Sequence, residues 1–202
     1  MKLTVSNLQK SFASRLIFKD VSFMIEQGNS LAITGHNGSG KTTLIRILCS
    51  LLRPDGGEIS FNKDNRIIKD FNYNYALVGP YLQLYDELSA FENLLFCARM
   101  KKTFTSSQDI YRMIEQVGLK GRAHDYVKTF SSGMKQRLKY AFALQTNPDV
   151  LYLDEPTSNL DKQGIEYVYS IMNEHKKNKI LVFATNDEDD LKLADRVVHI
   201  DA

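Results

Sequence analysis

The chain has 202 residues, of which 43% are hydrophobic and 25% are charged, as in an ordinary soluble protein large enough to bury a core. Its 26 Lys and Arg against 24 Asp and Glu leave a net charge of +2, so the charge balance gives no reason to expect a nucleic-acid partner. No apolar run approaches the ~18 residues of a membrane-spanning helix. Residues 1–12 lack the apolar core of a signal peptide. Cys49 and Cys97 fall in apolar helical patterns without metal-ligand companions, so we expect buried thiols in a cytoplasmic α/β protein.

The segment 31–48 reads LAITGHNGSGKTTLIRIL, which is a strand, a glycine-rich turn and the start of a helix. The turn matches the pattern G-x-x-x-x-G-K-[ST]. Its glycines let the backbone approach a phosphate closely, and the N–H groups at the helix start attract anions. A lysine placed here reaches the β- and γ-phosphates, and the hydroxyl after it ligates Mg²⁺. A glycine-rich turn with an incidental lysine is the alternative, but the flanking strand and helix favour a nucleoside-triphosphate site. We assign to it Gly35, Asn37, Gly38, Ser39, Gly40, Lys41, Thr42 and Thr43.

Residues 86–130 are expected to form a helical insertion. Ser89 and Glu92 have the spacing of a capping box that opens a helix running through Met100. Apolar residues then recur at helical spacing, and a glycine follows them where a helix would end. These residues are Ile110, Met113, Ile114, Val117 and Gly118.

The stretch FSSGMKQRLKYAFAL, residues 130–144, begins another helix. Ser131, Ser132 and Gly133 lie at its expected start, where hydroxyl and N–H groups face an anion from the positive end of the helix. An ordinary serine N-cap is the alternative for the same residues.

The stretch DVLYLDEPTSNLD, residues 149–161, is a buried strand pattern that ends in two acids, Asp154 and Glu155. In phosphate-loop enzymes, an Asp at the end of a neighbouring strand holds the Mg²⁺ shell. An adjacent Glu can orient or deprotonate the attacking water. Two exposed acids after a strand would be unremarkable alone, and it is the phosphate loop in the same chain that makes them catalytic candidates.

Near the end, ILVFATNDEDDL (residues 180–191) is an apolar strand followed by Asn186 and a row of acids. A buried strand that ends in one polar residue often delivers it to a site. The alternative is that Asn186 merely caps the acidic segment.

Three stretches in this order, GHNGSGKTT, FSSGMKQRLKYAFAL and LYLDEPTSNLD, resemble the nucleotide-binding domain of ATP-binding-cassette (ABC) proteins, and the resemblance covers nearly the whole chain. It implies an α/β fold: a P-loop NTPase core with a mainly parallel sheet, a small antiparallel β-subdomain that includes residues 56–62, and an α-helical insertion. The chain would be one domain, 1–202. Residues 1–85 and 131–202 would form the catalytic core with the β-subdomain, and residues 86–130 the helical subdomain.

The resemblance also implies partners. Two such domains pair head to tail, with ATP and Mg²⁺ between the phosphate loop of one and the signature of the other. Ser131 and Gly133 would then contact the γ-phosphate held by the partner, and Asp161 would lie at the dimer seam. Phe12 takes the place of the aromatic that stacks on adenine, unless it is a core residue of its strand.

The expected function is that of an ATPase subunit, homo- or heterodimeric, which is peripheral on the cytoplasmic face of the membrane. It would power an integral membrane transporter subunit of the exporter type. The alternatives are a soluble ABC ATPase without transport and an ATP-dependent regulatory clamp with weak hydrolysis.

Two positions depart from the family pattern. The family usually has a Gln that ligates Mg²⁺ where Pro80 stands here, and Gln83, three residues later, could replace it only in a reshaped loop. The family also has a His where this chain has Asn186. An amide can donate a hydrogen bond to a phosphate oxygen, but it cannot become cationic. With Lys41 and Glu155 present, we predict a slow ATPase and not an inactive one.

Overall fold

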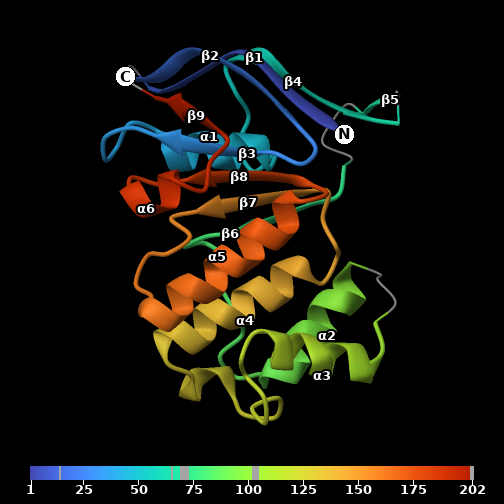
Figure 1. Cartoon of the computed structure of the whole chain (residues 1–202). Coiled ribbons are helices and arrows are strands. Elements are labelled where there is room, and N and C mark those ends of the chain that lie inside the picture. Colours follow the sequence, from blue (N-terminus) through green and yellow to red (C-terminus); the bar gives the residue numbers. More distant parts are fainter. Residues whose placement is uncertain (14, 65, 69–72, 102–104, 201–202) are drawn as a thin grey trace.

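The computed structural model describes residues 1–13, 15–64, 66–68, 73–101 and 105–200. Two β-sheets lie one above the other, with helices between and below them (Figure 1). The arrangement confirms the α/β P-loop class with a mainly parallel sheet and a small antiparallel one.

The smaller sheet is antiparallel and has the strand order β2-β1-β4-β5. Its strands are β1 (Lys2–Phe12), β2 (Arg15–Glu26), β4 (Gly56–Lys63) and β5 (Arg66–Ile68). Inward residues alternate along β1, so Leu3 pairs with Ile25 and Val5 with Phe23, all four buried. The segment expected in this sheet, residues 56–62, forms most of β4, and the prediction is confirmed.

The larger sheet is parallel and has the order β6-β7-β8-β3-β9. Its strands are β3 (Ser30–Thr34), β6 (Tyr75–Val78), β7 (Val150–Asp154), β8 (Ile180–Ala184) and β9 (Arg196–His199). All four pairings are parallel, so the carboxyl ends of the strands meet at one edge. In doubly wound folds that edge is where ligands bind.

Both faces of the parallel sheet are covered, which explains why its central strands are continuously apolar. On β3, Leu31 and Ile33 pack towards α1 (Lys41–Leu48) and the antiparallel sheet, whereas Ala32 packs towards the opposite face. There lie α4 (Ser132–Leu144) and α5 (Lys162–Lys176), as Figure 1 shows. A short helix, α6 (Glu188–Leu191), follows β8.

The helical region lies at the end of the molecule away from the antiparallel sheet (Figure 1). It contains α2 (Ala90–Met100), α3 (Ser107–Gln116) and the 3₁₀ turn η1 (Val127–Thr129). The capping box at the start of α2 is present, as predicted, and Gly118 follows α3 with a φ of +70°. The apolar core of this region also takes in Leu138 and Ala141 of α4, so it extends beyond residue 130.

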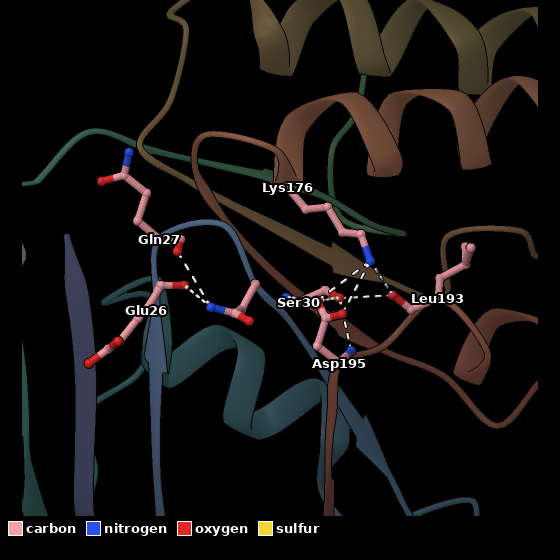
Figure 2. Close-up of polar contacts among 7 residues, drawn as sticks. Glu26, Gln27, Ser30, Lys176, Leu193 and Asp195 are labelled. Carbon is pink, nitrogen blue, oxygen red and sulfur yellow. Dashed lines mark hydrogen bonds and ion pairs between the residues drawn. The ribbon is translucent and has the colours of Figure 1, made fainter.

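The last strand is tied to the centre of the sheet by a polar cluster around the buried Ser30 (Figure 2). The backbone N–H of Ser30 donates to Asp195 Oδ2 at 2.8 Å, and the ammonium of Lys176 lies 3.5 Å from the same carboxylate. These contacts join β3, the approach to β9 and the end of α5. At the other end of β9, the N–H of Ile200 donates to the carbonyl of Thr34 on β3, and the Ile200 carbonyl limits the space available to Gly35.

Both cysteines are buried free thiols, as expected. Within the described ranges, no helix combines the length and apolar character needed to cross a membrane.

Candidate nucleotide-binding and catalytic site

A cavity of about 260 Å³ opens at the carboxyl edge of the parallel sheet. The phosphate loop follows β3 there, beside the ends of β7 and β8. Its lining residues come mostly from the phosphate loop and the start of α1: Ile17, Asn37, Gly38, Gly40, Lys41, Thr42, Thr43 and Glu155. A strand end, a glycine-rich loop and a helix N-terminus around one cavity form an anion-binding arrangement.

Two glycines of the loop are required by its shape. Gly35 has a φ of +148°, and a Cβ there would lie 2.3 Å from the Ile200 carbonyl oxygen and 2.6 Å from Ser39 Oγ. Gly40 has a φ of +104°, and a Cβ there would lie 2.4 Å from the side chain of Ile17. A side chain at Gly35 would push against the Ile200 backbone, and one at Gly40 would push against Ile17 of β2. The geometry of the loop therefore requires glycine at both positions.

The cation of the site is Lys41, the first residue of α1. Its Nζ donates to the carbonyl of Gly35 at 2.8 Å and to that of His36 at 3.4 Å, so the ammonium lies across the mouth of the loop. Ser39 Oγ is buried and has no hydrogen-bond partner among the described residues. A buried orphan hydroxyl and a nearly buried ammonium are costly without an anion, so this loop is suited to phosphate.

The residues of the predicted metal site meet at the end of β7. The Thr42 hydroxyl donates to Asp154 Oδ2 at 2.8 Å. Asp154 is only 2% exposed, and its Oδ1 has no partner within the described part of the chain. A buried carboxylate oxygen left free next to a hydroxyl oxygen is the hard-oxygen environment that Mg²⁺ prefers. These two residues therefore fit a magnesium ion, which would neutralise charge on the phosphates.

Glu155 lines the cavity directly after Asp154, with a φ of +52° that is unusual for a residue other than glycine. Its N–H donates to the carbonyl of Ala184 on β8 at 2.9 Å, which holds this backbone in place. Burial raises the pKa of the Glu155 carboxyl, the neighbouring Asp154 raises it further, and Lys41 opposes both. A carboxylate of raised pKa facing a phosphate cradle is suited to accept a proton from water.

Asn186 lies at the tip of β8 with an exposed side chain, and its Nδ2 donates to Oδ1 of Asn37 in the phosphate loop at 2.9 Å. The N-cap of α6 is Asp187, whose carboxylate accepts from the N–H groups of Asp189 and Asp190. The alternative that Asn186 caps the acidic segment is therefore wrong. The structure brings Asn186 to the nucleotide loop instead.

Residues 18–158 match the ABC transporter family. The chain belongs to the ABC transporter family. It is an ABC ATPase domain, with the ATP-binding function that defines such domains.

Its relatives in this family include an ABC transporter ATP-binding protein of Bacillus subtilis, YybJ, which is 36% identical over 96% of this chain and 89% of the relative. A cytochrome c biogenesis ATP-binding export protein of Vibrio vulnificus is 35% identical over 93% of this chain and 92% of its own length. An arginine transport ATP-binding protein of B. subtilis is 31% identical over 98% and 87%. Two further ABC transporter ATP-binding proteins of B. subtilis are longer, and this chain spans 55% and 66% of them.

Solved ABC structures share the fold. An ATP-binding subunit of an ABC transporter superposes with a TM-score of 0.85 at 26% identity, covering 100% of this chain and 86% of that one. The dimeric post-hydrolysis state of an ATP-binding cassette bound to ADP and phosphate superposes with the same TM-score at 23% identity, covering 98% and 94%.

The residues predicted to form the signature, and Asp161, do not line the cavity. Ser131 is the N-cap of α4, where its hydroxyl accepts the N–H of Met134, and Ser132 and Gly133 open the helix. Nothing within 4 Å would meet a Cβ at Gly133, so this surface is open. Asp161 is the exposed N-cap of α5 and accepts the N–H of Gly164 at 2.8 Å. These local caps leave the helix starts accessible to another molecule.

Phe12 ends β1 with a 48% exposed side chain, so the alternative that it belongs to the strand core is wrong. Lys10 Nζ lies 5.3 Å from the centre of its ring. The apolar wall that the structure does place in the cavity is Ile17 of β2, which the sequence reading missed. It was missed because nothing in the local pattern marks an aliphatic strand residue as a ligand neighbour.

The loop after β6 differs from the expectation for Gln83. Gln83 is exposed and lines a separate hollow with Lys135 and Lys139. The residue of this loop that contacts Asp154 is Tyr81, whose hydroxyl donates to Oδ2 at 2.9 Å. The sequence alone could not show this, because it depends on which side chain the turn after β6 directs towards β7.

A second group missed from the sequence is the carboxylate of Asp190, which is fully buried. It accepts hydrogen bonds from the hydroxyls of Thr157, Tyr169 and Thr185 at 2.8 to 3.0 Å. Thr157 follows Asp154 and Glu155, and Thr185 precedes Asn186. Asp190 therefore fastens the two segments that flank the site to each other.

Proposed function

We propose that this ABC domain binds and hydrolyses Mg²⁺-ATP as one half of a dimer. The proposal rests on one observation: the predicted site residues lie in two separate places on the domain. Lys41, Thr42 and Asp154 meet at the cavity, whereas Ser131 and Gly133 stand at an open helix start elsewhere. A second subunit, identical or homologous, would bring its signature to this cavity, as head-to-tail pairing in the family implies.

Roles follow from the geometry. Lys41 and the N–H groups of the loop bind the phosphates, and Thr42 with Asp154 holds the metal. Glu155 accepts the proton of the attacking water, since its carboxyl lines the cavity and has a raised pKa. Asn186 donates to the phosphate region as a neutral group, which makes turnover slow. Phe12 would stack on adenine if the base binds over the end of β1.

ATP hydrolysis by this chain would drive transport by a separate integral membrane subunit. The chain would be peripheral on the cytoplasmic face of the membrane. Exporter-type transport is proposed because a relative of matching length carries an export function in its name. An arginine transport protein matches over a similar share of the chain, and its name does not mention export. The direction of transport is therefore tested by identifying the membrane partner.

The test uses purified wild-type chain and the Glu155→Gln variant. Glu155→Gln should lower steady-state ATP hydrolysis by about a hundredfold or more while retaining ATP binding, because only the base is lost. It should also elute as a dimer with ATP during gel filtration. The matched control is Glu166→Gln on the exposed side of α5, which should hydrolyse ATP like wild type. Equal turnover of Glu155→Gln and wild type would contradict the proposal.

For transport, a tagged Glu155→Gln chain is recovered with ATP from detergent-solubilised membranes of its own cells. An integral membrane protein in stoichiometric amount supports the transporter function. The second candidate, a regulatory clamp with weak hydrolysis, is favoured by Asn186 in the place of the histidine. Recovery of soluble partners alone would support the clamp instead.

A further inference from the structure

The side chain of Tyr81 enters the metal site from a loop whose expected glutamine is absent. β6 ends at Val78, next to β7, and the following turn is closed by the N–H of Leu82 donating to the carbonyl of Gly79 at 3.2 Å. Pro80 is a favoured residue inside such a turn. A Cβ at Gly79 would lie 3.1 Å from that of Asp154, so the glycine lets the loop pass close to the acid.

Tyr81 is held in this position from two sides. Its hydroxyl donates to Asp154 Oδ2, the same oxygen that accepts from Thr42. The guanidinium of Arg46 lies 5.1 Å from the centre of its ring, a cation–π contact. Thr42 and Arg46 are four residues apart on α1 and so share one helix face. That face therefore contacts both the carboxylate and the ring.

The two oxygens of Asp154 are used unequally. Oδ2 accepts two hydroxyls, whereas Oδ1 is buried and accepts from none of the described residues. A carboxylate fixed through one oxygen by two donors keeps the other oxygen in a defined direction. Losing one donor would let the carboxylate rotate and would weaken any ligand that depends on Oδ1.

Core packing alone does not explain Tyr81. Its side chain is 41% exposed, so the apolar area that it buries is modest, yet its hydroxyl reaches a carboxylate that is 2% exposed. Gln83 is turned to another hollow, next to Lys135 and Lys139.

We propose that Tyr81 is the positioning residue of the magnesium site: its hydroxyl holds Asp154 so that Oδ1 is free for the ligand shell of the metal. The inference rests on the proposed Mg²⁺-ATP site and names the residue that supports it. Tyr81 acts through Asp154 and is not itself a catalytic residue.

The test measures the Kd of a fluorescent ATP analogue for the full chain in excess Mg²⁺ and in excess EDTA. The ratio of the two values is the gain in affinity due to the metal. Tyr81→Phe keeps the ring over Arg46 and removes only the hydroxyl, so it should reduce this gain about three- to tenfold, the net worth of one ordinary hydrogen bond at a partly exposed side chain. The Kd in EDTA should be unchanged.

Two variants complete the design. Tyr85→Phe, the same change at an exposed residue four positions later, should behave like wild type. Tyr81→Gln replaces the hydroxyl with an N–H donor and should keep more of the gain than a variant without a donor, which a purely structural role of the ring would not allow. It also keeps the test valid if Tyr81→Phe does not fold.

An unchanged gain in Tyr81→Phe, or equal weakening in Mg²⁺ and EDTA, would overturn the role of Tyr81. A wild-type chain that binds the analogue equally well with and without Mg²⁺ would instead overturn the metal site itself.

Discussion

Asn186 reaches the phosphate loop with a neutral amide at the position where the family has an imidazole. Its amide nitrogen donates to Asn37, so the side chain is already beside the groups that bind phosphate. A charge-assisted hydrogen bond is about twice as strong as a neutral one. We therefore predict that the absence of a cation at Asn186 limits the rate of ATP hydrolysis.

Asn186→His should raise turnover, because an imidazolium can stabilise charge that develops on the γ-phosphate. The expected increase in kcat is about tenfold or more, up to the hundredfold that one such contact commonly supplies. Phosphate release at saturating ATP measures it. Asn178→His, an exposed asparagine after α5, is the control. Equal kcat in Asn186→His and wild type would show that the amide does not limit hydrolysis.

At the scale of elements, side-chain hydrogen bonds stabilise helix N-termini and connect short segments. α3 begins with a second capping box, in which Ser106 accepts the N–H of Asp109 and Asp109 accepts that of Ser106. The Asp190 carboxylate joins the segment after the catalytic acids to the segment before Asn186.

Ser106→Ala should lower the free energy of unfolding by about 1 kcal/mol, since it removes the acceptor for an N–H at the start of α3. Urea unfolding monitored by circular dichroism measures it. The neighbouring Ser107→Ala, at the first helical residue, should change stability by less than half of that. Equal losses in the two variants would mean that the cap contributes nothing specific.

Asp190→Asn replaces one accepting oxygen with an NH₂ group that cannot accept from Thr157 or Thr185. We expect a loss of about 1 to 2 kcal/mol in unfolding free energy, together with reduced turnover. Asp189→Asn, an exposed neighbour, should cost little because surface ion pairs are weak. Full stability and turnover in Asp190→Asn would show that the two segments need no link through this side chain.

At the scale of the whole molecule, stability depends on how the second face of the parallel sheet is covered. His175, near the end of α5, lines a cavity of about 480 Å³ on that side, and its Nε2 is buried without a partner in the described part of the chain. Burial, and to a smaller extent the charge of Lys179, lower the pKa of His175 from 6.5 to about 4.

Because the pKa of His175 is lower in the folded chain, the unfolded chain binds more protons at acidic pH. The stability due to neutral His175 is fully present above pH 6.5 and is lost as the pH falls towards 4. After allowance for partial exposure, we expect about 1 to 2 kcal/mol. Urea unfolding at pH 7 and pH 4.5 measures it. His175→Gln should lose less stability on acidification than wild type, and exposed His124→Gln should not differ from wild type. Identical pH dependence in all three would contradict the prediction.

Much of this site could be read from residues close together in the chain. The phosphate loop, the acids after β7 and the cap of α2 are contiguous patterns, and the structure has them where they were predicted. The sequence could not predict that Tyr81, and not Gln83, is the residue of this loop that contacts Asp154. This contact depends on a turn after β6 and on the distance to Asp154, which lies 73 residues later in the sequence.

The sequence by itself determined the fold class and the order of the phosphate loop, signature and acidic strand, because each is a local pattern of backbone conformation and polarity. Only the tertiary structure decided which side chains share Asp154 and which reach Asp190. Those contacts join separate strands at one edge of a sheet, and their partners are selected by the packing of the whole domain. Local preference does not encode that selection.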